Sequence, residues 1–430
     1  MVGVNKSGLV GKFTSYSVNV FLYFFLLHFI QRCGQLVLNI DLHIPQLLSL
    51  SSLLFFLFYA INKKKELMDC IVILYLFYML LNGIFFKYYG SYHSTLVYYA
   101  FTGQFCFTLF YFMGRYSAYS IVSVLDKMKI PLLVSMFIGI YCFLYSPGWY
   151  MAMKIGQLNE FGSNYMEIMR LSSIWGHPYH LSYATLLYSI YLMYRLFYGN
   201  MIEKKYYAML LLCFIILFLC QLRVCIMFFV FAFFLFTILN PNKRKNKKNI
   251  SIALTAIFLV LTVQITTSKL SGEHINYIEE HMLNLFDDEH LDTRFEHTRG
   301  DIISYTFWGE GWGKYGDNAR AINKWAIFDN EYQHHIAELG YFGLGILLLV
   351  LVYALVRGFR YRKVVFVEFL LICFYAIAMF GASVLIHASQ YGYVFWFCVG
   401  RVVSASGSSC KILNRNESST HRVRIGQSNA

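Results

Sequence analysis

The sequence predicts an all-α, polytopic integral membrane protein with about twelve transmembrane helices, within a range of eleven to thirteen. Hydrophobic residues make up 58% of its 430 residues and charged residues only 14%, whereas soluble domains carry about 25% charged residues. Apolar runs recur along the chain, and many approach the roughly 20 residues that a helix needs to cross a bilayer. Because so apolar a chain cannot cover itself with polar surface, a soluble globular fold is excluded.

The first apolar run follows a polar N-terminus without a small-residue cleavage site, so we interpret it as a retained helix and not as a signal peptide. The predicted spans are 17–40, 44–61, 67–86, 96–114, 130–146, 179–199, 206–221, 224–239, 250–267, 336–356, 364–386 and 389–405. They divide the chain into an N-terminal bundle (1–146), a first long loop (147–178), a second bundle (179–267), a large loop (268–335), a last bundle (336–405) and a polar tail predicted to be disordered (406–430).

Lysine and arginine predict the orientation, because loops rich in these residues face the cytoplasm. The basic runs fall in every second loop, at 62–66, 126–129, 203–205, 240–249 and 357–363. This alternation places both termini in the cytoplasm and both long loops outside. Orientation and attraction to anionic membrane lipids explain the net charge of +13, so no nucleic-acid partner is predicted.

The ten cysteines predict neither a disulfide framework nor a zinc site. The chain contains no C-x-x-C pair, and most cysteines lie inside apolar runs, where a free thiol behaves as a small hydrophobe. The groups suited to chemistry are instead concentrated on the predicted outer side. The large loop holds more than half of the 23 acidic residues, and five of the six tryptophans lie in the two long loops.

Arg223 lies between two apolar runs with almost no loop around it. A charge this close to hydrocarbon costs about 2.5–3.5 kcal/mol unless it is paired or hydrated. The side chain either snorkels to the interface at a tight turn or faces a hydrated cavity that binds an anion. Arg170 precedes "SSIWGHPYHLSY", where Gly176 and Pro178 interrupt the helix beside His177. That stretch is either an ordinary junction or backbone that re-enters the membrane beside water.

The glycine-rich run "WGEGWGKYG" (308–316) matches no nucleotide-binding fingerprint. Its two tryptophans, Trp308 and Trp312, either stack on a sugar face or belong to the aromatic belt at the membrane interface.

The stretch "DNEYQHHIAELGYFG" (329–343) carries polar side chains into an apolar run. Asp329 and Asn330 are suited to cap the helix, but capping does not explain two adjacent histidines. Either histidine could act as a general base that a glutamate orients. The E-x-x-H spacing also makes a metal conceivable, but no second carboxylate–histidine pair on another helix supports one, so no metal site is predicted.

If this stretch is helical, His334 and Glu338 share a face because they are four residues apart, and His335 lies three residues from Glu338. We therefore consider Glu338 and Glu331 as the groups that would orient the base.

Three segments in order resemble bacterial O-antigen polymerases (Wzy-type) and the related O-antigen ligases. They are Arg170 ahead of "GHPYHLSY", Arg223 opening an apolar helix, and the run from "TRF" through "WGEGWG" to "DNEYQHHIAELGYFGLG". The family pattern in the last segment is an Arg, a G-x-G and then (D/H)N-x-Y…E-x-G-x-x-G. It is matched by Arg294, Gly309, Gly311, Asp329, Asn330, Tyr332, Glu338, Gly340 and Gly343. Ligases typically carry His where this chain has Asp329, which favours the polymerase.

The resemblance implies an all-helical, GT-C-like glycosyltransferase in the bacterial inner (plasma) membrane. It would join oligosaccharide repeat units carried on undecaprenyl diphosphate, at the outer face, into O-antigen or capsular polysaccharide. It implies no cofactor, no nucleotide sugar and no obligatory metal. The implied partners are the lipid-linked oligosaccharide, membrane lipids and a chain-length regulator protein.

A diphosphate leaving group needs preorganised cations, and an attacking hydroxyl needs a base. The expected catalytic residues are Asp329, His335 and Glu338, the expected diphosphate-binding residues are Arg170, Arg223 and Arg294, and the expected substrate-binding residues are Arg299, Trp308, Trp312, Asn330, Tyr332 and His177. The alternatives are an O-antigen ligase of the same superfamily and a flippase or transporter for a lipid-linked glycan. Transporters usually show inverted repeats, and we find no internal repeat in the sequence.

Overall fold

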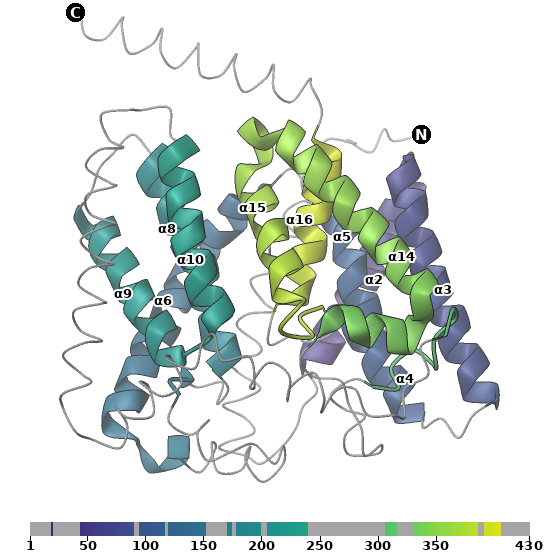
Figure 1. The fold of residues 1–430 in the computed structure, drawn as a ribbon, viewed down its shortest axis with the longest axis horizontal. Helices are drawn as coiled ribbons and strands as arrows, with labels where there is room; N and C mark the ends of the chain where they lie inside the picture. Colours follow the sequence, from purple (N-terminus) through teal and green to yellow (C-terminus); the bar gives the residue numbers. More distant parts are fainter. Residues whose placement is uncertain are drawn as a thin grey trace, which may run out of the picture. The chain divides into compact units, whose positions relative to one another are not determined.

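The structure is a computed structural model, and the all-α prediction is confirmed for the residues that it describes (Figure 1). Among the described residues, four helices are long and apolar enough to cross a membrane, as expected of a multi-pass membrane protein: Leu67–Phe85, Leu96–Tyr116, Ile121–Tyr145 and Glu331–Arg360. The described residues are 19, 44–89, 94–116, 119–151, 170–173, 178–198, 204–239, 306–315, 330–385 and 391–405.

The predicted spans 17–40 and 250–267 lie outside the described residues, apart from residue 19. Each of the other predicted spans overlaps a helix. Several of these helices are shorter than a bilayer requires, among them Arg223–Ile238 and Gly392–Ser404. The total of twelve spans therefore remains a prediction.

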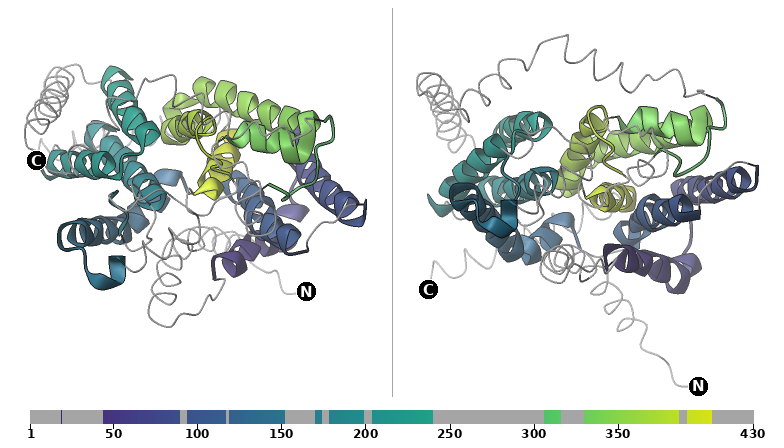
Figure 2. Two further views of the ribbon diagram at one scale, coloured as in Figure 1. Left: turned by 60° about the horizontal axis from the view of Figure 1, so that its bottom comes forward. Right: turned by 90° about the horizontal axis from the view of Figure 1, so that it is seen from below.

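The helices belong to two compact units. The first unit contains α2 (Ile44–Phe58), α3 (Leu67–Tyr89), α4 (Ser94–Ala100), the π-helical turn η2 (Phe101–Phe105), α5 (Cys106–Tyr116), α14 (Glu331–Arg360), α15 (Arg362–Ala378) and α16 (Gly392–Ser404). The second unit contains α6 (Ile121–Tyr145), α8 (Pro178–Tyr198), α9 (Lys204–Cys220) and α10 (Arg223–Leu239). Within it α8, α9 and α10, drawn in teal in Figure 2, pack side by side.

Two glycines allow α5 and α16 to pack closely against each other in the first unit. A Cβ atom on Gly114 would lie 2.0 Å from the carbonyl oxygen of Phe397, and one on Gly400 would lie 2.0 Å from that of Tyr111. Small residues serve this purpose in membrane proteins because backbones can then approach closely where lipid provides no hydrophobic driving force.

The sequence prediction was wrong about residues 126–129, which form part of helix α6 and not a loop. The charges of this run are accommodated on the helix surface. Asp126 Oδ1 lies 3.0 Å from Arg195 on α8 and 3.3 Å from Lys129. It also accepts a hydrogen bond from Tyr191. Because these charges are paired, the helix can continue through them. The charged run therefore did not mark the start of α6.

Candidate functional site

The candidate site begins at the N-terminus of α14, where Asn330 caps the helix. Its backbone is extended (φ −152°, ψ 108°), and its Oδ1 accepts a hydrogen bond of 3.1 Å from the backbone N–H of Gln333. This arrangement satisfies one of the amides that a helix start leaves unpaired. The capping prediction is thus confirmed for Asn330, whereas Asp329 lies outside the described residues. Tyr332 donates a hydrogen bond of 2.9 Å to the carbonyl of Ala376 on α15.

Helix α14 bends sharply at Gly340, which has φ 68° and ψ −176° (Figure 1). The bend leaves backbone carbonyls of the preceding turn without their helical hydrogen bonds. Backbone N–H groups of the segment 306–315 donate hydrogen bonds to them instead. Glu310 N–H donates to the carbonyl of Ala337 at 2.8 Å, and Gly311 N–H donates to that of Glu338 at 3.2 Å. A break in a helix is tolerated inside the membrane where other protein groups form hydrogen bonds with the freed backbone atoms in this way.

The glycines on both sides of this contact are sterically required. A Cβ atom on Gly309 would lie 2.2 Å from the carbonyl oxygen of Glu338. One on Gly340 would lie 2.2 Å from the carbonyl oxygen of Phe307. Gly309 also has a positive φ of 81°, a conformation that glycine adopts without cost. The G-x-G and E-x-G elements of the sequence therefore pack directly against each other.

His335 lies at the centre of a fully buried polar group. Its Nδ1 is 3.0 Å from the carbonyl oxygen of Glu331 and 3.1 Å from the Oε1 atom of the same residue. Its Nε2 is 2.7 Å from the hydroxyl of Tyr75 on α3 and 3.1 Å from the amide nitrogen of Gln104 in η2. Both ring nitrogens thus have polar partners, as burial demands.

His334 forms a second carboxylate–histidine pair with Glu338, because the two residues are one helical turn apart. His334 Nε2 lies 3.0 Å from Glu338 Oε1, which also accepts a hydrogen bond of 2.8 Å from the backbone N–H of Tyr315. Glu331 Oε2 in turn accepts one of 2.9 Å from the N–H of Leu385. The structure therefore pairs Glu338 with His334 and Glu331 with His335.

The two predicted tryptophans differ in their surroundings. Trp312 is 1% exposed, and its indole N–H donates a hydrogen bond of 2.6 Å to Gln104 Oε1. Trp308 is 58% exposed, and its carbonyl accepts hydrogen bonds from Tyr78 and Asn82 of α3. Of the two indole rings, only that of Trp308 is accessible to a sugar, and stacking there stays a prediction.

A salt bridge holds the end of the 306–315 segment together. Lys314 Nζ lies 2.6 Å from Glu310 Oε2, which also accepts a hydrogen bond from the phenol of Tyr315. Burial and this neighbouring carboxylate raise the pKa of the Tyr315 phenol, so that the phenol stays protonated and remains a donor.

The described arginines of the predicted diphosphate site belong to the second unit. Arg170 is almost fully buried, and the next residue, Leu171, donates a backbone hydrogen bond of 3.1 Å to Leu219 near the end of α9. Arg223 opens α10 three residues after α9 ends. The chain at residues 170–171 and the start of α10 therefore lie at the same end of α9. Of the other predicted residues, Arg294, Arg299 and His177 lie outside the described residues.

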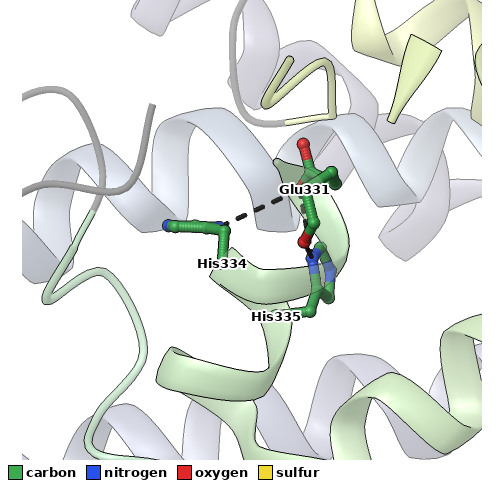
Figure 3. Close-up of side chains that lie close together, drawn as sticks. All are labelled: Glu331, His334 and His335. Carbon is green, nitrogen blue, oxygen red and sulfur yellow. Dashed lines mark hydrogen bonds and ion pairs between the residues drawn. The ribbon is translucent and has the colours of Figure 1, made fainter. Parts of the chain in front are cut away.

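By distance alone, the site could hold a metal ion. Glu331, His334 and His335 each offer one ligand atom, and these atoms lie within 4.8 Å of one another (Figure 3). The hydrogen bonds of His335 weigh against this reading. Its Nδ1 faces a backbone carbonyl, which can only accept a hydrogen bond, so a metal on this nitrogen would leave that carbonyl without its donor.

Several members of the site were not singled out from the sequence, notably Tyr75, Asn82 and Gln104. Asn82 and Gln104 carried a usable signal, because each is a polar residue inside a predicted apolar span and such residues are by default functional candidates. Comparison with models of known protein families finds no match, and neither does comparison with curated proteins.

Proposed function

We propose that this chain polymerises oligosaccharide repeat units carried on undecaprenyl diphosphate, at the outer face of the bacterial inner membrane, for O-antigen or capsular polysaccharide. One observation carries the proposal. The two halves of the motif that resembles this family, around Gly309–Gly311 and Glu338–Gly340, contact each other beside the buried acid–base residues of α14. This contact supports the proposal because it brings the two halves of the motif to one place beside the acid–base residues of α14.

The reaction needs a base and a stabilised leaving group. A hydroxyl of the acceptor unit attacks the anomeric carbon of the donor, the bond to the diphosphate breaks, and the lipid diphosphate leaves with the electron pair. The hydroxyl proton goes to a base, for which His335 with Glu331, or His334 with Glu338, are the candidates. We assign Asp329 to the same acid–base region by its place in the motif.

Arg170, Arg223 and Arg294 are assigned to the diphosphate. Guanidinium groups remain charged and donate hydrogen bonds in pairs to phosphate oxygens. Preorganised cations of this kind stabilise the charge that develops as the diphosphate leaves. The start of α10 and residues 170–171 lie at one end of α9, which supports a common role for Arg170 and Arg223.

Deletion of the gene from its host, followed by analysis of surface and lipid-linked glycans, tests the proposal against its alternatives. A polymerase deletion leaves single repeat units on the outer surface and no long chains. A ligase deletion leaves long chains on undecaprenyl diphosphate that never reach their final acceptor. A flippase deletion leaves single units trapped inside. Only the first result is compatible with the proposal, and the wild-type gene must restore long chains.

A further inference from the structure

The environment of His335 specifies which of its ring nitrogens carries the proton. Trp312 has an indole nitrogen that can only donate a hydrogen bond. It donates to Gln104 Oε1 at 2.6 Å. The amide of Gln104 is thereby fixed, with its oxygen toward Trp312 and its NH₂ group toward His335 Nε2, 3.1 Å away. An NH₂ group can only donate, so Nε2 must accept.

The opposite side of the ring requires the same proton position. His335 Nδ1 faces the carbonyl and the carboxylate of Glu331 at 3.0 and 3.1 Å. Glu331 Oε2 accepts a hydrogen bond from the backbone N–H of Leu385, and the Glu331 carbonyl, which faces Nδ1, can only accept. Nδ1 therefore donates. Two independent sets of contacts, from α14 and from Trp312 through Gln104, agree on one tautomer.

We infer that His335 is held as the neutral Nδ1–H tautomer with Nε2 as a proton acceptor, and that Gln104 and Trp312 are the positioning residues that hold it so. Gln104 lies in the π-helical turn η2, a rare feature that is frequent at functional sites. Trp312 comes from the glycine-rich segment that packs on the bend of α14. Trp312 thus acts on His335 through Gln104 and not by direct contact.

Tyr75 is the partner through which a proton can reach this base. Its hydroxyl lies 2.7 Å from His335 Nε2. Unlike the Gln104 amide, a hydroxyl can turn from donor to acceptor. Tyr75 and His335 are both 0% exposed, so in the proposed reaction, on which this step rests, acceptor binding must first open a path to the Tyr75 hydroxyl. Tyr75 then takes the proton of the attacking hydroxyl as it gives its own proton to Nε2. Tyr75 ends unchanged, His335 gains one proton, and Glu331 stabilises the imidazolium that forms, as in other carboxylate–histidine pairs.

Nitrogen NMR of the full chain in lipid nanodiscs, with ¹⁵N-labelled histidine, tests the tautomer directly. Protonated and unprotonated ring nitrogens resonate in different regions, and the His335→Gln variant identifies the signals among the 13 histidines. We expect Nδ1 to be protonated and Nε2 to be unprotonated near neutral pH. An unprotonated Nδ1 in the wild-type protein would overturn the inference.

Two variants test the positioning role. Gln104→Glu replaces the donor beside Nε2 by a carboxylate, so we expect Nε2 to become protonated. Trp312→Phe releases the amide, so we expect a mixture of tautomers. Trp308→Phe is the matched control in the same segment, and its His335 signals should not move. Unchanged signals in Gln104→Glu and Trp312→Phe would show that these residues are merely structural.

Two further measurements separate this inference from the metal reading and from the proposed function. Added Zn²⁺ should leave the Nδ1 signal of His335 in place, and a zinc-dependent shift would show a metal site instead. Tyr75→Phe should keep the tautomer, because Gln104 still fixes it, but should lose chain extension by about 10²-fold or more. The predicted NMR spectra in a protein without polymerase activity would mean that the tautomer stands and the proposed function fails.

Discussion

Replacement of Gly340 by alanine should detach the glycine-rich segment from α14. Gly340 has φ 68° and ψ −176°, a region that is essentially restricted to glycine and costs other residues about 1–3 kcal/mol. The new Cβ atom would also lie 2.2 Å from the carbonyl oxygen of Phe307 and 2.4 Å from the backbone nitrogen of Gly309. These are backbone atoms that cannot turn aside, and such overpacking costs about 1–3 kcal/mol more.

The expected loss for Gly340→Ala is therefore about 2–6 kcal/mol, as the sum of strain and overpacking. Gly345 provides a matched control on the same helix, because nothing lies within 4 Å of a Cβ atom placed there. Gly345→Ala should be neutral or stabilising by up to about 1 kcal/mol, since alanine favours helix over glycine.

The measurement is the thermal unfolding midpoint of both purified variants in lipid nanodiscs, followed by tryptophan fluorescence, together with glycan chain length in cells. Gly340→Ala should unfold at a clearly lower temperature and make no long chains. Equal midpoints and equal chain lengths in the two alanine variants would refute the described packing of residues 306–315 on the bend.

Three further predictions follow from charge, topology and packing. Arg223→Ala should abolish long chains at normal protein level, and Arg223→Lys should restore them only in part, because a point charge cannot bind two phosphate oxygens as a guanidinium does; full activity with alanine would show a snorkelling role. Reporter fusions at Lys245 and Lys363 should report cytoplasm, and fusions at Asn284 the outside; an external signal at Lys245 would overturn the orientation. Gly400→Ala should lower the unfolding midpoint, because its Cβ atom would lie 2.0 Å from a carbonyl of α5, and an unchanged midpoint would contradict that contact.

The helical class and most helix positions followed from hydrophobic runs, because span length is a local property of the sequence. Helix α14 is an example, with its Asn330 cap and its His334–Glu338 pair both predictable from spacing along one helix. The boundary of α6 was not predictable, because pairing of Asp126 with Arg195 on another helix removes the need for a loop.

The surroundings of His335 could not be predicted from the spacing of residues along one helix. Tyr75 and Gln104 are separated from it by 260 and 231 residues, and no periodicity in one segment identifies partners that distant. The bend at Gly340 was likewise hidden, because the run around it is apolar and looks continuous. Its cause is non-local, since the freed carbonyls are satisfied by residues from the 306–315 segment.

Chain extension by purified protein tests the central claim, that buried acid–base pairs at the start of α14 serve polymerisation of lipid-linked repeat units. The assay combines the full chain in lipid vesicles with a synthetic undecaprenyl-diphosphate repeat unit. We predict that the wild-type protein and Gly345→Ala lengthen the glycan, and that folded His335→Ala is slower by about 10²–10⁴-fold, as expected for loss of a general base. Extension by folded His335→Ala within a few-fold of the wild-type rate, or no extension by the wild-type protein, would contradict the account.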